Sequence, residues 1–169
     1  MKTKKNEEKK KLQPFEIGEL DQYLFGQGTH YEIYEKMGAH LAEEDGKAGT
    51  YFSVWAPNAR SVSVVGDFNN WDRTAHPMQP VQQSGIWDIF VPGVKAGDLY
   101  KFAVETSQGY TVLKADPYGN QSQLRPDNAS VVADIRYFDW TDQAWRKAHQ
   151  EKTTESPMAI YEVQQGSGK

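Results

Sequence analysis

The sequence predicts a mainly β protein, an immunoglobulin-like antiparallel β-sandwich with short N-terminal helices and a C-terminal helical linker. Two observations lead to this prediction. Short segments rich in β-branched and aromatic residues recur from Thr50 to Ala133, and Gly, Pro and Asn turn signals separate them about every eight to twelve residues. Apolar and polar side chains alternate within several of these segments, which is typical of antiparallel strands with one face on a core.

The first 14 residues are rich in charge and poor in apolar side chains. Lysines from Lys2 to Lys11 are mixed with Glu7 and Glu8, so residues 1–14 are interpreted as a disordered basic tail. A basic arm for an anionic partner is the alternative.

Residues 15–48 are predicted to form a helical N-terminal extension. Apolar residues at helical spacing indicate a helix from Phe15 to Phe25, which Gly26 ends. A second short helix is expected from Tyr31 to Met37, and the polar, glycine-bearing segment Glu43–Gly49 is expected to be a turn.

Residues 49–135 hold the predicted sandwich. Alternation within the expected strand Leu99–Glu105 indicates that Tyr100, Phe102 and Val104 share the core face, which leaves Lys101 on the other face. Trp55 and Trp87 lie within strands and are interpreted as core or edge packing. The expected strands are, in order, Thr50–Ala56, Ser61–Phe68, Ile86–Val91, Leu99–Glu105, Tyr110–Lys114 and Ser130–Ala133.

The chain after the sandwich is predicted to be a helical linker at residues 136–157. Its helix is expected over Trp140–Gln150 with Thr141 as the N-cap, and Ser156-Pro157 breaks it. Met158–Val163 then has the character of one more strand, and only a polar run follows it to residue 169. A strand with nothing after it predicts a domain that has been cut off.

Composition excludes several classes of function. A chain of 169 residues suits one domain with extensions, and the absence of cysteine excludes disulfides and cysteine-ligated metals. The net charge of −4 argues against nucleic acid as a partner. No stretch reaches the ~20 apolar residues that span a bilayer, and the charged N-terminus is no secretory signal. We therefore expect a cytoplasmic monomer that does not bind membranes.

No motif for catalysis or for a cofactor is found. Gly26-Gln27-Gly28 lacks the third glycine of a dinucleotide fingerprint, and no glycine-flanked nucleophilic serine occurs. The four histidines, which have no metal-ligand spacing, are His30, His40, His76 and His149. The sequence therefore predicts no cofactor, no metal and no catalytic residues.

The segment GDFNNWD at residues 66–72 is the best candidate for a binding site. Here a strand ends in a polar loop with Trp71 at its tip, where the flat indole could cover the CH face of a sugar ring. The amides of Asn69 and Asn70 could bond to sugar hydroxyls as donors and acceptors. Lys101 and Tyr110 would join this site if their strands neighbour the loop. In the alternative interpretation, Trp71 folds back as a corner plug of the sandwich.

The sequence also resembles a known family. The run GTYFSVWAPNARSVSVVGDFNNWD at residues 49–72 is similar to the family-48 carbohydrate-binding module at the front of glycogen (1,4-α-glucan) branching enzymes. The segments FDWTDQAWRK and SPMAIYEV resemble the linker and the first strand of the catalytic (β/α)8 barrel of those enzymes. Further segments agree in order: EKMGAHL at 35–41, HPM at 76–78, SGIWDIFVPG at 84–93, LYKF at 99–102, KADPYG at 114–119 and RPDNASVV at 125–132.

This resemblance implies an α-glucan-binding module of a branching enzyme that acts in glycogen biosynthesis. The catalytic carboxylates of the family lie in the barrel and have no matching position here, so no transferase activity is expected of this chain alone. Residues 158–169 would be an orphan first strand of the missing barrel, left by a natural truncation, a frameshift or a deliberate cut. The partners implied are α-1,4-glucan or glycogen, bound weakly, and that barrel.

Related modules in kinase β subunits that sense glycogen indicate which residues would touch the sugar. Trp71 and Lys101 match a loop Trp and a strand Lys of those modules, and Tyr110 replaces a second Trp. Two alternative functions remain open. The module could be a structural domain that docks on the barrel and binds little sugar, or the equivalent module of an isoamylase-type debranching relative.

Overall fold

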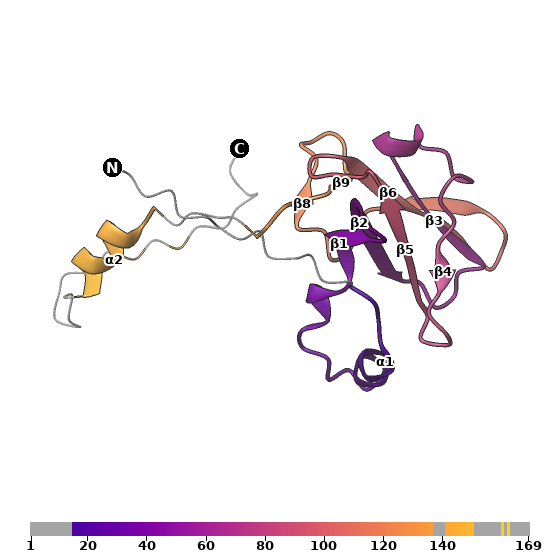
Figure 1. Ribbon diagram of the computed structural model, residues 1–169, viewed down its shortest axis with the longest axis horizontal. Helices are drawn as coiled ribbons and strands as arrows, with labels where there is room; N and C mark the ends of the chain where they lie inside the picture. The colour runs from indigo at the N-terminus through magenta and orange to yellow at the C-terminus, as the bar shows by residue number, and fades with distance from the viewer. Residues whose placement is uncertain (1–14, 137–140, 151–159, 161, 163–169) are drawn as a thin grey trace. The chain divides into compact units, whose positions relative to one another are not determined.

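A computed structural model describes residues 15–136, 141–150, 160 and 162 of the chain. The chain divides into two units, one up to Ile135 and one from Arg136. The described part of the first unit is a sandwich of two antiparallel sheets (Figure 1), which confirms the predicted fold class.

Each sheet takes strands from distant parts of the sequence. Sheet A has the order β1-β2-β5-β4, with β1 at Gly38–Glu44, β2 at Lys47–Trp55, β5 at Ile86–Pro92 and β4 at Gln79–Pro80. Sheet B has the order β3-β6-β9-β8, with β3 at Ser61–Gly66, β6 at Leu99–Glu105, β9 at Ser130–Val131 and β8 at Gln121–Ser122. Strand β7, Thr111–Lys114, also pairs with β6.

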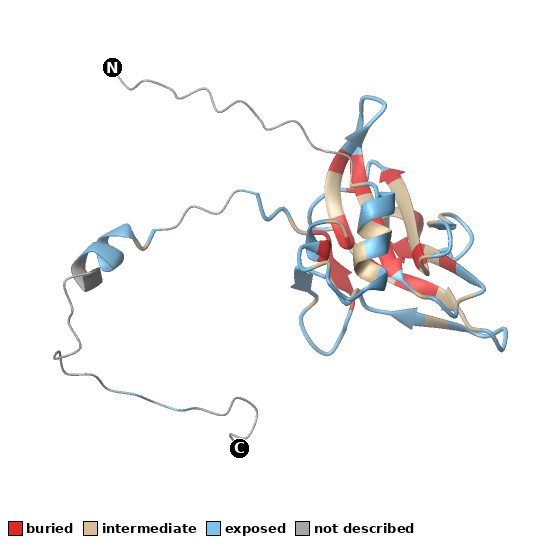
Figure 2. Ribbon diagram, turned by 90° about the horizontal axis from the view of Figure 1, so that it is seen from below, coloured by how far each residue is buried: buried red, intermediate tan, exposed pale blue. Residues whose placement is uncertain are grey.

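The core lies between the inner faces of the two sheets, where Figure 2 shows the buried segments in red. Phe52 of β2 meets Tyr100 of β6 edge to face, with ring centroids 5.0 Å apart. Phe102 is also fully buried, and Val104 is half-buried against the same cluster. The predicted core face of this strand is therefore confirmed. Trp87 packs on the core as expected, whereas Trp55 is 53% exposed.

The extension at residues 15–48 is helical only in its first half, which corrects the prediction. Strand β1 occupies Gly38–Glu44 and pairs with β2 along its whole length. Its Ala, Leu and Glu residues favour helices in isolation, so pairing with a buried strand overrides the local propensity. The turn after β1 has positive φ at Asp45 (50°) and Gly46 (74°), as a two-residue hairpin of type I′ requires.

Helix α1, Glu19–Gly26, and the short 3-10 helix η1, Ile33–Glu35, cover part of the outer face of sheet A. Instead of the predicted helix over Tyr31–Met37, only the single turn of η1 forms. The layer is attached to β5 by a small apolar cluster that includes Ile33, Met37 and Ile86. Part of this sheet face is thus covered by chain that precedes the sandwich.

Asp21 of α1 fastens this layer together. Its carboxylate accepts hydrogen bonds from the backbone N–H of Gly18 (2.8 Å), from His30 Nε2 (2.8 Å) and from Lys36 Nζ (2.5 Å). Burial works to raise the pKa of Asp21, but the hydrogen bonds from Lys36, His30 and Gly18 together lower it to about 2. The ionised carboxylate is therefore the form that the folded chain selects.

The second unit contains α2, Gln143–Gln150, which is shorter than the helix predicted over Trp140–Gln150. Arg146 Nε donates to Asp142 Oδ2 at 2.7 Å, one turn earlier. Trp140 and nearly all of the strand expected at Met158–Val163 lie outside the described residues. None of the helices in the described ranges is long and apolar enough to cross a membrane.

Asp21→Asn should lower the free energy of unfolding at neutral pH. The folded pKa is depressed below the ordinary value, so the stability that Asp21 adds is present above about pH 4 and is lost as the pH falls toward 2. Urea unfolding at several pH values would show the difference between wild type and variant shrinking through this window. Asp45→Asn, in the exposed β1–β2 turn, is the matched control and should change little. A difference that stays constant down to pH 2 would contradict the role of the carboxylate.

Candidate functional site

The loop after β3 begins against the neighbouring strand β6. A Cβ added to Gly66 would lie 2.1 Å from the carbonyl oxygen of Leu99 and 2.6 Å from Cε1 of Phe68. No side chain fits in that space, so the loop requires glycine at this point. The chain then turns at once into the 3-10 helix η2, Asp67–Asn69.

Two consecutive residues of η2 hold the loop onto the sandwich. The ring of Phe68 stacks on Phe52 with centroids 5.9 Å apart and packs against the core. Asn69 is buried, and its Oδ1 accepts a hydrogen bond from the backbone N–H of Gly66 (2.9 Å). Its Nδ2 donates to the carbonyl of Val64 (3.0 Å) and to Nδ1 of His76 (2.9 Å).

This geometry corrects the prediction for Asn69. Both protons of its amide are used inside the protein and its oxygen is occupied and buried, so the side chain shapes the loop and does not face a ligand. Asn70, the next residue, is exposed.

Trp71 projects from the end of this loop. Asn70 and Trp71 both have left-handed backbone conformations, with φ of 53° and 60°. Such a conformation costs a bulky residue roughly 1 kcal/mol and is common at functional sites. Trp71 is half-exposed, and its Nε1–H donates to Asp67 Oδ1 at 3.1 Å. The described residues that pack on the core include Phe68 but not Trp71, so Phe68 is the corner plug.

Asp67 connects this loop to the start of β6. Its Oδ1 accepts from Trp71, and its Oδ2 accepts from the backbone N–H of Leu99 at 3.4 Å. In the strand pairing, Gly66 lies opposite Tyr100 and Val65 lies opposite Lys101. Trp71 and Lys101 are therefore at the same end of sheet B.

Lys101 points to the outer face of sheet B, since its neighbours Tyr100 and Phe102 point into the core. Its Nζ donates a hydrogen bond to Oδ1 of Asn128, in the loop before β9. Asn128 is exposed, and sequence reasoning did not assign it to the site. The two residues are 27 positions apart, so no local pattern could indicate the contact.

The structure does not bring Tyr110 to this surface, which corrects the prediction. Its carbonyl accepts a hydrogen bond from the backbone N–H of Thr106 at the far end of the β6–β7 hairpin. Five residues of strand separate Lys101 from Thr106, or roughly 17 Å. Because side chains alternate, a residue opposite Thr106 also lies on the other face from Lys101.

Leu113 occupies the position that was expected for Tyr110. It pairs with Ala103, which shares the outer face of β6 with Lys101, and it is 41% exposed. The surface therefore combines an indole, a cation with its amide partner, and an apolar side chain. These can cover the apolar face of a ligand and bond to its hydroxyl groups. Among the described residues, no three His, Asp or Glu side chains are grouped to hold a metal ion.

Two carboxylates support this end of the sheet. Tyr100 donates to Asp116 Oδ2 at 2.6 Å, and burial raises the pKa of Asp116. At the end of the Trp71 loop, hydrogen bonds from the backbone and hydroxyl of Thr74 lower the pKa of Asp72.

Comparison with known proteins gives a family match that covers strands β1 to β7 of the sandwich. Residues 36–119 match the model of carbohydrate-binding module 48 (isoamylase N-terminal domain). The chain is 52% identical over 154 residues to a protein of Protochlamydia amoebophila described as 1,4-alpha-glucan branching enzyme GlgB, which covers 90% of the chain and 21% of that relative. A protein of Butyrivibrio fibrisolvens with the same description is 52% identical over 152 residues, 89% of the chain and 24% of the relative.

Among solved structures, a putative alpha amylase from Salmonella typhimurium superposes with a TM-score of 0.49 at 25% identity. The match covers 64% of the chain and 16% of that protein. The chain thus spans about a fifth to a quarter of the length of the branching enzymes that it resembles.

Asn69→Ala should destabilise the protein by about 1–3 kcal/mol, because the variant leaves the buried N–H of Gly66 and carbonyl of Val64 without partners. The near-ultraviolet circular dichroism of Trp71 should weaken as the loop loosens. Asn70→Gly is the matched control: glycine adopts the positive φ of this position freely, so stability should change little. Equal stability of the two variants would show that the Asn69 amide does not hold the loop.

Proposed function

The chain belongs, through residues 36–119, to the carbohydrate-binding module 48 family, and on this premise we propose that it binds α-1,4-glucan through the surface around Trp71 and Lys101. The observation that carries the proposal is the position of Trp71. A tryptophan that is kept out of the core, in a strained backbone conformation, on a loop held by its neighbours, has the properties of a ligand platform.

The binding residues proposed are Trp71, Asn70, Lys101 and Asn128, with Leu113 beside them. The indole would stack on the CH face of a glucose unit. Lys101 and Asn128 already form a hydrogen-bonded pair, which orients both side chains before a ligand arrives. The amide of Asn128 and the exposed amide of Asn70 can both donate and accept, as sugar hydroxyls require. The ligand has no charge to attract, so weak, millimolar binding is expected.

We further propose that the chain is a non-catalytic module of a 1,4-α-glucan branching enzyme. The relatives that share about half of its residues carry this description, and the chain covers only a part of each. The carboxylates of the described residues serve structural hydrogen bonds or lie exposed, and no transferase activity is expected of this chain alone. A cytoplasmic location and glycogen as the larger ligand follow from the same proposal.

The domain division is proposed with one change. The carbohydrate-binding module begins with β1 at Gly38, since that strand completes sheet A. The helical layer at residues 15–37 is attached to its outer face, and Ile135 ends the unit. The basic segment 1–14, the linker at 136–157 and the segment 158–169 keep the limits that the sequence predicted.

Trp71→Ala should weaken the binding of maltoheptaose about fivefold, since a stacked aromatic contact is worth about 1 kcal/mol. Titration followed by tryptophan fluorescence or calorimetry would measure it. Tyr110→Ala is the matched control: it removes an exposed aromatic ring of the same sheet, but one at the far end of the hairpin, and should leave binding unchanged. Loss of binding in the Tyr110 variant alone would overturn this placement of the site. No saturable binding by the folded wild type would remove the proposal altogether.

Leu113→Trp should tighten maltoheptaose binding by a similar factor. The new indole would lie on the outer face of sheet B, two residues along the strand from the position beside Lys101. Isothermal titration would compare it with Lys114→Trp, the next residue, whose side chain alternates to the opposite face of the strand. Tighter binding only in the Leu113 variant is the expected result, and equal effects of both would contradict the assigned face.

A second candidate function is that of a docking domain that binds little sugar. The observation in its favour is a group of exposed apolar side chains in and near the helical layer. Interfaces between domains are enriched in such Tyr and Trp residues. The exposed apolar side chains of this group are Leu20, Tyr23, Tyr31, Tyr34 and Trp55. A folded wild type that fails to bind maltoheptaose would favour the docking function over glucan binding.

A further inference from the structure

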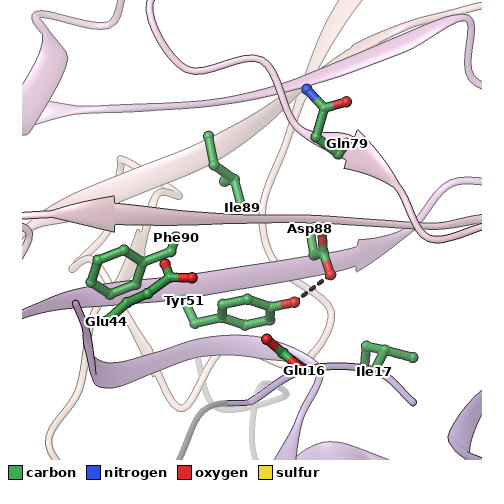
Figure 3. Close-up of a pocket in the computed structure, with 8 residues that line it drawn as sticks. All are labelled: Glu16, Ile17, Glu44, Tyr51, Gln79, Asp88, Ile89 and Phe90. Atoms are coloured by element: carbon green, nitrogen blue, oxygen red, sulfur yellow. Dashed lines mark hydrogen bonds between the residues drawn. The ribbon is translucent and has the colours of Figure 1, made fainter.

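A pocket of about 430 Å³ lies on the outer face of sheet A, on the opposite sheet from Trp71 and Lys101. Figure 3 shows its floor, where Tyr51 of β2 donates a hydrogen bond through its hydroxyl to the carboxylate of Asp88 of β5. The helical layer packs on this face around Ile86, and Glu16 and Ile17 at its start border the pocket beside Tyr51. The pocket is the part of the sheet face that the layer leaves open.

The walls of the pocket differ in chemistry. Phe90 of β5 contributes an apolar wall, and its ring reaches over Gly49, where a Cβ would lie 2.8 Å from Cζ of Phe90. Ile17 lines the opposite side, from the segment that leads into the helical layer. Ile89 of β5 also lines the pocket, and polar side chains on the exposed rim complete the lining: Glu16, Glu44 and Gln79.

The pocket is lined by hydrogen-bond acceptors and by no positively charged side chain. Three carboxylates, those of Glu16, Glu44 and Asp88, line the pocket, and no Lys or Arg does so. Burial, together with the negative charge of Glu16, raises the pKa of Asp88, although the hydrogen bond from Tyr51 opposes this. An anionic ligand is therefore excluded by charge.

We propose that this pocket is a second binding site for a short segment of α-glucan. A glucose unit carries hydroxyl groups that donate to carboxylates, and Gln79 can both donate and accept. Its CH face can lie on Phe90. The volume falls in the range of small-molecule sites, and apolar walls with a few convergent polar groups are the usual lining of such sites. A cationic ligand would use the carboxylates and the ring of Phe90, but it would leave the amide N–H groups of Gln79 without a partner.

The inference takes its ligand class from the proposed function but rests on separate residues. A module with one site on each sheet could hold two chains of a branched polysaccharide at once. Such two-point attachment raises the affinity for glycogen well above the affinity for a short oligosaccharide.

Two-dimensional amide NMR of the full chain during titration with maltotriose would test the proposal. Two separate groups of amides should shift and saturate: one around Gly66–Trp71 and Lys101, and one around Tyr51, Gln79 and Asp88. Trp71→Ala should abolish the first group and leave the second. The double variant Glu16→Ala/Glu44→Ala should weaken the second site about tenfold and leave the first unchanged. Both rim residues are exposed, so this variant should fold.

Other outcomes separate this inference from the proposed function. Saturation of the Trp71 group alone would overturn the second site and leave the proposed function intact. Shifts at Tyr51 and Asp88 with the cation spermidine, but not with maltotriose, would also overturn it, because the pocket would then select charge. Saturation of the second group alone would support the pocket and remove the proposed role of Trp71.

Discussion

The buried amide of Asn69 is the interaction on which the binding surface depends. It bonds to the backbone at the end of β3, at Val64 and Gly66, and to His76 in the segment after the loop. Phe68 packs on the core beside it, whereas the indole of Trp71 stays outside the core cluster and is half-buried. A loop tryptophan held outside the core in a left-handed backbone conformation supports the proposal of a ligand platform.

Strand β6 contributes side chains to the core from one face and to the candidate site from the other. Its alternation sends Tyr100 and Phe102 into the core and Lys101 to the outer face, and the start of the same strand receives Asp67 from the Trp71 loop. The packing of Tyr100 and Phe102 in the core therefore fixes the position of Lys101 on the same strand. Rigid elements hold binding groups more accurately than loops do, which suits a site that must act on a weakly bound, uncharged ligand.

The sequence predicted the sandwich and the core face of β6, because each of these follows from local pattern. It missed β1, since the Ala, Leu and Glu residues of that strand favour helix and only pairing with β2 makes them extended. It misplaced Tyr110 because chain order in a hairpin says nothing about the length of the loop or the register, and register decides the face. Asn69 was assigned to the ligand because a polar loop residue looks exposed in sequence. Asn128 could not be found, since it meets Lys101 only in the fold.

The helical layer explains why the two outer faces of the sandwich differ. Sheet B carries its candidate site on the outer face at Lys101, where the neighbouring Val65 and Ala103 are buried beneath longer side chains. Sheet A is partly covered, and the edge of the cover turns a flat face into a pocket with Glu16 and Ile17 as one wall. Asp21 holds the parts of that cover together through three hydrogen bonds, and the apolar cluster around Ile86 attaches it to the sheet. Any ligand of the pocket is thus coupled to the attachment of the layer: binding would stabilise the docked helix, and loosening the helix would remove one wall of the site.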